Sequence, residues 1–281
     1  MVPKVIQSVA DMQAELPPGP RVAVMTMGAL HAGHTALMDR AREIAGTDGQ
    51  VAVSIFVNPT QFAPGEDFSR YPRSWEEDLA ACGEHGVDLV FAPTAEDLYS
   101  AGTDISIDPG PLGTVLEGAV RPGHFRGVLT VVAKLMNIMR PTHAVYGEKD
   151  FQQLALITRM VASLNLPVTV IGVPTVRESD GLAMSSRNAY LSTDDRATAA
   201  VIPRAIAAAV AAAESGARAG DVVAAAEQIL EAEPGVELDY VALSGPEFGQ
   251  APAEGPARLL VAAKIGPPRL LDNVAIQLDP K

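Results

Sequence analysis

The chain has one cysteine, few basic residues and no long apolar run. Cys82 cannot form a disulfide within the chain, so we expect a buried apolar role for its thiol and a reducing compartment, the cytoplasm. The apolar runs are shorter than the roughly 18–20 residues of a membrane-spanning helix. Residues 1–4 lack the basic-then-apolar pattern of a signal peptide. These absences argue against a secreted or membrane-spanning protein.

Acidic residues outnumber basic ones, 34 to 21, and the formal net charge is −13. Such a surface repels a phosphate backbone, so nucleic acid is not an expected partner. A small anionic substrate would need a local cluster of basic groups. Hydrophobic residues make up 48% of the 281 residues and charged residues 20%, as in globular enzymes of one large domain or two.

Short apolar runs alternate with helical patterns between residue 21 and about residue 175. The expected strands are 21–26, 51–57, 87–91, 144–146 and 168–171. The expected helices are about 35–46, 74–84, 125–139 and 151–163. This alternation predicts an α/β fold with a Rossmann-like, doubly wound parallel sheet. Ligands bind such sheets at the carboxyl ends of strands, where we place residues 27–34, 58–61 and 147–150.

The pattern changes after about residue 175, so we expect one domain over 1–175 and another over 176–281. Ala-rich helical patterns cover 193–213 and 219–232. Strand-like runs follow at 238–243, 258–263 and 274–278. Helices followed by strands predict a smaller α+β C-terminal domain.

Residues 27–34 read Met-Gly-Ala-Leu-His-Ala-Gly-His and lie between an expected strand and an expected helix. A helix start offers unpaired N–H groups and a partial positive charge, so it attracts phosphate. His31 and His34 add side-chain donors, while Gly28 and Gly33 let the backbone approach a ligand closely. We therefore expect a nucleoside triphosphate site. The alternative is a pair of structural histidines at a helix cap.

Two further segments offer groups for phosphate. Residues 147–150, Gly-Glu-Lys-Asp, follow a strand; Lys149 can reach phosphates as a flexible point charge, and Asp150 can accept from ribose hydroxyls. Residues 184–188, Met-Ser-Ser-Arg-Asn, offer two hydroxyls and the forked guanidinium of Arg187. The alternatives are a solvated strand-to-helix turn and a polar interdomain loop.

Longer blocks extend these motifs over nearly the whole chain. They are T-M-G-A-L-H-A-G-H (26–34), F-V-N-P-T-Q-F-A-P-G-E-D-F-S-R-Y-P-R (56–73), L-E-G-A-V-R-P-G-H-F-R-G-V-L-T-V-V (116–132), Y-G-E-K-D-F-Q-Q-L (146–154), V-P-T-V-R-E-S-D-G-L-A-M-S-S-R-N (173–188) and A-A-K-I-G-P-P-R-L-L-D-N (262–273). In this order they resemble the pantothenate synthetase (pantoate–β-alanine ligase) family of the nucleotidyltransferase α/β superfamily.

The resemblance implies an ATP-dependent ligation of pantoate and β-alanine to pantothenate, AMP and pyrophosphate through a pantoyl adenylate. It also implies Mg²⁺ with the ATP, a homodimer and a C-terminal lid. It makes His34, in the position of a proton donor, together with His31, Lys149 and Arg187 the expected catalytic residues. The expected ATP contacts are Met27, Gly28, Ala29, Leu30, His31, Ala32, Gly33, His34, Gly147, Glu148, Lys149, Asp150, Val176, Met184, Ser185, Ser186 and Arg187.

The resemblance also assigns the other substrates. Gln61 and Gln153 are expected to bind pantoate, since amides both donate to a carboxylate and accept from hydroxyls. Asn58 and Gln61 are expected near β-alanine. Glu77-Asp78 resembles an acidic pair near the metal, with Asp78 the expected Mg²⁺ ligand. The alternatives are surface glutamines and a solvated helix face. Arg121 and His124 either line the pocket or belong to a structural loop.

The chain departs from the family pattern at two places. Met25 stands where the family usually has proline, which restores a backbone donor and loosens φ. Pro267-Pro268 replaces a residue followed by threonine, and the lost hydroxyl puts any contact from that loop in doubt.

Other functions remain as alternatives. A plain nucleotidylyltransferase would explain the histidines but not blocks 56–73 and 116–132. A non-catalytic nucleotide-binding relative would not need His31, His34, Lys149 and Arg187 intact. The acidic surface and the absence of a large tRNA-binding appendage argue against an aminoacyl-tRNA synthetase.

Overall fold

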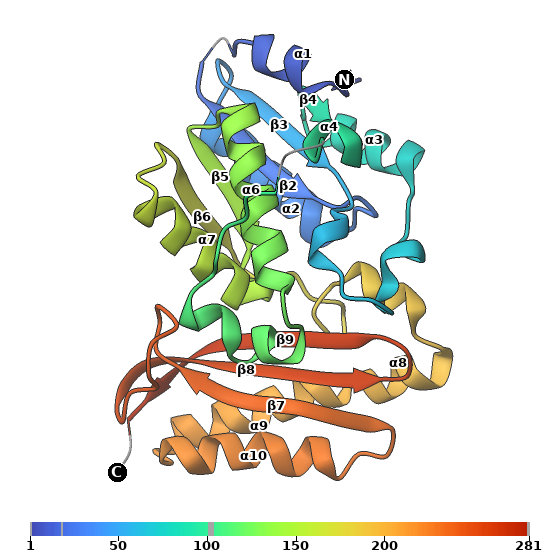
Figure 1. Cartoon of the computed structure of the whole chain (residues 1–281). Helices are drawn as coiled ribbons and strands as arrows, with labels where there is room; N and C mark the ends of the chain where they lie inside the picture. The colour runs from blue at the N-terminus through green and yellow to red at the C-terminus, as the bar shows by residue number, and fades with distance from the viewer. Residues whose placement is uncertain (1, 18, 101–103, 280–281) are drawn as a thin grey trace. The chain divides into compact units, whose positions relative to one another are not determined.

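Figure 1 shows the computed structural model of the chain, which describes residues 2–17, 19–100 and 104–279. Contacts divide the chain into two units. The first contains Met1–Glu148 and Gln152–Pro174, and the second contains Lys149–Phe151 and Thr175–Lys281. The short segment between the two halves of the first unit therefore groups with the C-terminal part of the chain.

The first unit is built on a six-stranded sheet with the order β1-β4-β3-β2-β5-β6. The strands are β1 (Lys4–Ile6), β2 (Arg21–Thr26), β3 (Gln50–Ile55), β4 (Leu89–Phe91), β5 (His143–Gly147) and β6 (Thr169–Val173). All neighbouring strands are parallel. After β2, the chain adds β3 and β4 on one side of this strand. It then adds β5 and β6 on the other side. The topological switch point, where such sheets bind ligands, thus lies between the ends of β2 and β5.

Helices connect these strands. They are α1 (Val9–Ala14), α2 (Ala32–Ala45), α3 (Trp75–Glu84), α4 (Ala95–Leu98), α5 (Glu117–Val120), α6 (His124–Met139) and α7 (Phe151–Ser163). Short 3-10 helices lie between them: η1 (Pro59–Gln61), η2 (Asp67–Ser69), η3 (Pro111–Thr114) and η4 (Glu148–Asp150).

The two faces of the parallel sheet carry different side chains. Val22 and Val24 of β2 pack in one core cluster with Leu37 and Met38 of α2. Ala23 is fully buried but lies outside that cluster, because successive strand residues point to opposite faces. The apolar helix α6 contacts β2 and crosses in front of the sheet in Figure 1. The predicted α/β fold with a doubly wound parallel sheet is confirmed.

The second unit pairs a three-stranded antiparallel sheet with helices. The strands β7 (Val236–Ser244), β8 (Gly255–Ile265) and β9 (Arg269–Leu278) lie in sequence order. The helices are η5 (Ser186–Tyr190), α8 (Thr193–Ala199), α9 (Val201–Glu214) and α10 (Ala219–Glu231). Residues of α9 and α10 form one apolar cluster with inward side chains of the sheet, including Leu259 and Val261 of β8. This is the smaller α+β unit that the sequence predicts.

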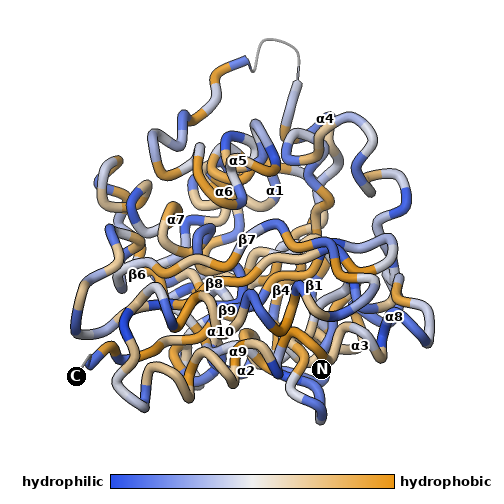
Figure 2. Tube along the Cα trace, turned by 90° about the horizontal axis from the view of Figure 1, so that it is seen from below, coloured by the Kyte–Doolittle hydropathy of each residue, from blue (hydrophilic) through white to orange (hydrophobic). Residues whose placement is uncertain are grey.

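Residues Thr193–Glu214 are long and apolar enough to be compared with a membrane-spanning helix. In the fold they form two helices, α8 and α9. Ile202, Ile206 and Ala209 of α9 are buried in the core against the sheet. The apolar residues that colour α9 tan and orange in Figure 2 are thus those of a core helix of the second unit.

The structure differs from the sequence prediction in a few elements. The sequence prediction missed β1 and α1, which have only three and six residues. The single helix expected over 193–213 is interrupted at Ala200. Pro203 explains the interruption, because it has no N–H to donate to residue 199 and its ring would clash with that carbonyl; proline suits the first turn of a helix instead.

Candidate active site

The turn after β2 has a backbone conformation that few residues tolerate. Gly28 has φ +81° and Ala29 has φ +51°. A Cβ at Gly28 would lie 2.9 Å from Oδ2 of Asp78, so glycine is required there by conformation and by space. Thr26 at the strand end accepts from the Gly28 N–H through its hydroxyl at 3.2 Å. The turn is therefore fixed on both sides by side chains.

His31 and His34 begin the helix that follows this turn. Nδ1 of His31, the N-cap of α2, accepts from the Gly33 N–H at 3.1 Å. Nδ1 of His34 accepts from the His31 N–H at 3.3 Å, and the two ring centroids are 4.1 Å apart. Since Nδ1 accepts in both rings, each neutral imidazole carries its proton on Nε2. The two rings cap the helix through Nδ1, and this role does not use Nε2–H, so the capping and phosphate-binding interpretations are compatible.

Asp78 lies in the first turn of α3 and is 2% exposed. Its Oδ2 accepts from the Ala29 N–H at 2.9 Å, and its Oδ1 accepts from the Leu30 N–H at 2.8 Å. The Ser74 hydroxyl donates to Oδ1 at 3.1 Å. The carboxylate therefore holds the main chain of the turn.

These contacts bear on the expected magnesium site. The carboxylate oxygens of Asp78 are engaged by main-chain and hydroxyl donors, and the neighbouring Glu77 is exposed. Over residues 2–17, 19–100 and 104–279, no group of three or more His, Cys, Asp or Glu side chains is placed to hold a metal ion. Three donors occupy most of the roughly four lone-pair positions of the Asp78 carboxylate, so its contacts give it a structural role in the turn. The Mg²⁺ ligand role expected for Asp78 stays a prediction.

Gln61 and Asn58 lie beside the turn. Asn58 is fully buried after β3 and donates through Nδ2 to Oε1 of Gln61 at 3.1 Å and to the Gly127 carbonyl at 3.2 Å. The Tyr99 hydroxyl donates to Oδ1 of Asn58 at 2.9 Å. Nε2 of Gln61 contacts Sδ of Met27 at 3.1 Å. The structure thus brings the predicted residues Met27, Asn58 and Gln61 together, with Asn58 orienting the Gln61 amide.

Arg121 and His124 hold the main chain of the same loop. Burial, with the Arg121 charge beside it, lowers the pKa of His124 to about 4, so the ring is neutral at pH 7. Its Nδ1 donates to the Gln61 carbonyl at 2.9 Å, and its Nε2 accepts from Arg121 at 3.1 Å. Arg121 in turn pairs with both carboxylate oxygens of Glu66, at 2.8 and 2.7 Å. These are the contacts of a structural loop that positions Gln61.

Two adjacent glutamines of α7 have different environments. Gln152 is 3% exposed, and its amide nitrogen donates to the carbonyls of Leu112 and Val115 at 2.8 and 2.9 Å. Its oxygen accepts from the Glu117 N–H at 3.1 Å. Gln153, the expected pantoate ligand, is half-buried. Gln152 therefore fixes the 112–117 segment, a role that the sequence analysis missed.

In the second unit, residues 176–184 form a narrow antiparallel turn. Arg177 and Ala183 form a β-bridge, and the Met184 N–H donates to the Val176 carbonyl at 3.0 Å. Gly181, with φ +92°, closes the turn. Val176 and Met184, both expected at the nucleotide, are thus main-chain partners.

The segment that follows starts a 3-10 helix. The hydroxyl of Ser185 caps η5 by accepting from the Arg187 N–H at 3.2 Å. Nδ2 of Asn188 donates to Oε1 of Glu178 at 2.7 Å, which ties this helix back to the turn. Ser185, Ser186 and Arg187 are half-buried.

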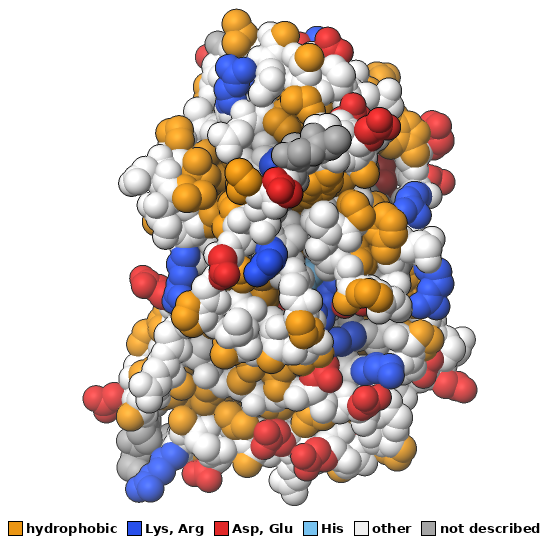
Figure 3. Space-filling view, viewed as in Figure 1, with side chains coloured by type: hydrophobic (Ala, Val, Ile, Leu, Met, Phe, Trp, Pro, Cys, Tyr) orange, Lys and Arg blue, Asp and Glu red, His pale blue; other side chains and the backbone are white. Residues whose placement is uncertain are grey.

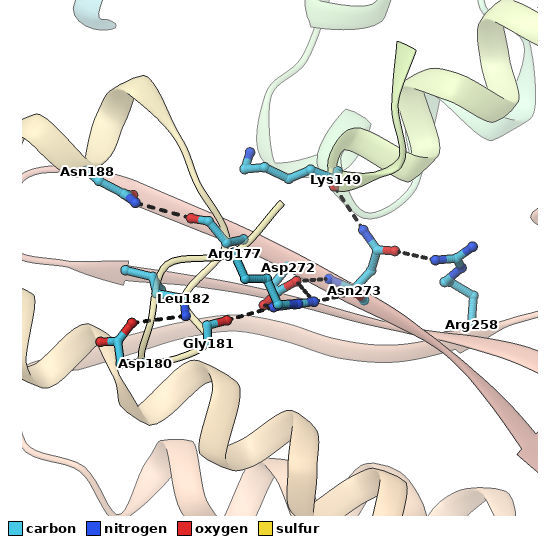
Figure 4. Close-up of polar contacts among 10 residues, drawn as sticks. Lys149, Arg177, Asp180, Gly181, Leu182, Asn188, Arg258, Asp272 and Asn273 are labelled. Atoms are coloured by element: carbon cyan, nitrogen blue, oxygen red, sulfur yellow. Dashed lines mark hydrogen bonds and ion pairs between the residues drawn. The ribbon is translucent and has the colours of Figure 1, made fainter. Parts of the chain in front are cut away.

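Lys149 follows the end of β5 and groups with the second unit. Its side chain is 18% exposed, and its Nζ lies 3.5 Å from Oδ1 of Asp150. Its main-chain carbonyl accepts from Nδ2 of Asn273 in β9 at 2.9 Å, as Figure 4 shows. Lys149 and Arg187 therefore belong to the same unit, whereas His31 and His34 belong to the first.

The structure shows the surroundings of the residues at which the chain departs from the family pattern. Met25 lies in the central strand β2, and its sulfur accepts from the Tyr146 hydroxyl at 3.2 Å. Pro267 and Pro268 lie in the β8–β9 hairpin, where the Ile265 N–H donates to the Pro268 carbonyl at 3.1 Å. Cys82 is buried, as the sequence predicts, and burial, with the charge of Asp78, raises the pKa of its thiol to about 12.

Figure 3 shows acidic side chains spread singly or in pairs among apolar and polar ones on the face it displays. This distribution agrees with the net charge of −13. Local groups such as Lys149 and Arg187 would therefore have to provide the attraction for a phosphate.

The fold is that of α/β proteins that bind ligands at the carboxyl ends of parallel strands. A model of the family described as pantoate-beta-alanine ligase matches residues 4–275. The pantothenate synthetase of Saccharopolyspora erythraea is 55% identical over 255 residues, which cover 91% of this chain and 83% of that protein. That of Mycolicibacterium smegmatis is 54% identical over 257 residues, with 92% and 81% covered. The chain belongs to the pantoate–β-alanine ligase family and is an enzyme of the ligase class.

Solved structures agree with this assignment. The pantothenate synthetase of Thermus thermophilus aligns with a TM-score of 0.92 and 46% identity, covering 96% of this chain and 98% of that chain. The pantoate-beta-alanine ligase of Francisella tularensis, complexed with beta-gamma ATP and beta-alanine, aligns with a TM-score of 0.79 and 31% identity, and 97% of each chain is covered.

Proposed function

We propose that this enzyme joins pantoate to β-alanine at the expense of ATP in two steps. In the first, a carboxylate oxygen of pantoate attacks the α-phosphorus of ATP, which gives pantoyl adenylate and releases pyrophosphate. In the second, the β-alanine amine attacks the acyl carbon; the new C–N bond forms, AMP leaves and the amine loses a proton. The observation that carries this proposal is the helix start at His31, with two Nε2–H donors, in a chain of this ligase family.

The described residues suit the charges of the first step. Negative charge builds on phosphate oxygens, which positioned donors stabilise. We assign His31 and His34 to the phosphates, with His34 as the proton donor to a phosphate oxygen. Lys149 and Arg187 take the β- and γ-phosphates and the α-phosphate during transfer. The remaining nucleotide contacts are residues 27–30, 32–33, 147–148, 150, 176 and 184–186.

We assign the other two substrates, pantoate and β-alanine, to side-chain amides. Gln61, whose oxygen is held by Asn58, offers Nε2–H to the carboxylate of pantoate, and Gln153 completes that site. We place β-alanine near Asn58 and Gln61. Mg²⁺ enters the proposal only as the counterion of ATP, held by phosphate oxygens and water, with no ligand assigned in the chain.

We further propose that residues 1–175 form the catalytic domain and residues 176–281 a lid that closes during turnover, in a cytoplasmic homodimer. The first assay is pyrophosphate exchange into ATP with pantoate present or withheld. Exchange that requires pantoate supports the ligase. Exchange without pantoate would point to a nucleotidylyltransferase, and binding of ATP without exchange would point to a non-catalytic relative.

A further inference from the structure

The side-chain amide of Asn273 joins two segments that are distant in the sequence. Asn273 lies in β9 and is 3% exposed. Its Nδ2 donates to the Lys149 carbonyl at 2.9 Å, and its Oδ1 accepts from Arg258 at 2.9 Å (Figure 4). The two contacts need opposite ends of the amide, so together they define its orientation.

Arg258 is itself held against an aromatic pair. Its guanidinium carbon lies 4.1 Å from the centroid of the Phe151 ring, and Phe151 stacks on Phe248 with centroids 5.9 Å apart. Phe151 is two residues after Lys149. The segment Lys149–Phe151 is thus held at its carbonyl by Asn273 and at its ring by Arg258.

The neighbouring residue of β9, Asp272, holds the turn that precedes Arg187. Both oxygens of Asp272 pair with Arg177, at 2.6 and 2.9 Å, and the side chain of Asp272 is 1% exposed. Arg177 also donates to the Gly181 carbonyl at 2.9 Å, which braces the turn that leads to Met184 (Figure 4). Consecutive residues of one strand therefore contact Lys149 and the 176–184 turn that precedes Arg187.

We propose that Asn273 is a positioning residue for adenylation, which fixes the main chain at Lys149 so that the ammonium group meets the phosphates of ATP. This inference rests on the proposed function of Lys149. Because misplacement of a reacting group by about 1 Å can cost about 10²-fold in rate, the loss of this hydrogen bond should slow the first step far more than the second.

The test compares Asn273→Asp with the wild-type enzyme. Aspartate keeps an oxygen for Arg258 but puts a second oxygen against the Lys149 carbonyl. Pantoate-dependent pyrophosphate exchange should fall by about 10- to 100-fold with a raised KM for ATP. The rate at which supplied pantoyl adenylate reacts with β-alanine should stay within about twofold. Asn273→Ala, which removes the donor without adding a charge beside Asp272, serves if the first variant does not fold.

Asn137→Asp is the matched control, since Asn137 is exposed and also donates to a main-chain carbonyl, that of Ala133, at 2.8 Å. It should leave both rates unchanged. In a Lys149→Ala background, Asn273→Asp should cause little further loss, because the two residues act through one interaction. The inference would be overturned if the losses caused by Asn273→Asp and Lys149→Ala add fully. It would also be overturned if Asn273→Asp slows both half-reactions equally or leaves pyrophosphate exchange unaltered. A wild-type enzyme without pantoate-dependent exchange would instead overturn the proposed function, and this inference with it.

Discussion

Asp78 accepts a hydrogen bond from the main-chain N–H of Ala29 at 2.9 Å, across 49 residues of sequence. Ala29 has φ +51°, a conformation that costs a residue with a Cβ roughly 1–2 kcal/mol. A hydrogen bond to a charged group contributes about 1.5–3 kcal/mol, which is enough to offset that strain. The carboxylate therefore stabilises the turn that presents His31.

We expect Asp78→Asn to slow pantoate-dependent pyrophosphate exchange by roughly 10- to 100-fold, because the new NH₂ group faces a main-chain N–H of the turn. Direct binding of Mn²⁺ in the presence of ATP, measured by electron paramagnetic resonance, should be unchanged. Glu77→Gln, at the exposed neighbour, is the control and should behave as wild type. A specific loss of Mn²⁺ binding in Asp78→Asn would restore the metal-ligand role instead.

Two substitutions at His34 distinguish the roles of its two ring nitrogens. Asparagine can replace Nδ1 as the acceptor for the His31 N–H, whereas glutamine can replace the Nε2–H donor. We expect His34→Asn to fold normally and to lose roughly 10²-fold in exchange rate, while His34→Gln retains more activity. Exchange kinetics and thermal unfolding of both variants check this. The reverse order of activities would show that His34 serves only as a cap.

Lys149→Ala should lower the rate of adenylate formation by roughly 10²–10³-fold, the scale of losing one preorganised charge donor. The second half-reaction, started from supplied pantoyl adenylate, should change little, because the triphosphate is gone by then. Lys264→Ala, at a half-exposed lysine paired with Glu237, is the control. A near-normal exchange rate in Lys149→Ala would remove this residue from the mechanism.

His124 should make stability depend on pH. Its pKa is near 4 in the folded protein, below the usual 6.5, so between these values the unfolded chain binds a proton that the folded chain does not. The contribution of His124 to the free energy of unfolding is therefore fully present above about pH 6.5. It falls by roughly 3 kcal/mol as the pH drops towards 4. Urea unfolding from pH 7.5 to 4.5 should show a steeper loss for wild type than for His124→Gln, which cannot titrate. Parallel curves would contradict a neutral buried imidazole.

Much of the fold could be predicted because it follows from local patterns. Valine-rich runs such as β2 and β3, each followed by an amphipathic or apolar helix, define a parallel α/β sheet by periodicity alone. The glycine turn before His31 is equally local, since strand, turn and helix start are contiguous. Short or polar elements such as β1 gave no periodic signal, and the break at Ala200 depended on one proline.

The roles of several site residues could not be predicted this way. Gln152 and Gln153 are identical in type and adjacent, yet Gln152 is fixed to the main chain of another segment while Gln153 is half-buried. The resemblance marks Asp78 only as part of an acidic pair near the metal, whereas its hydrogen bonds to the Ala29 and Leu30 N–H groups appear only in the fold. Asn273 lies within the block 262–273, but no pattern linked it to Lys149.

The sequence by itself determined the order of the longer strands and helices, the glycine turn and helix start at His31, and the family. Those properties depend on residues within a few positions of one another, or on the match of whole blocks. The tertiary structure alone decided what holds the site in shape: Asp78 on the turn, His124 on Gln61 and Asn273 on Lys149. Those pairs lie 48 to 124 residues apart, and only strand register and helix packing bring their atoms within hydrogen-bond distance.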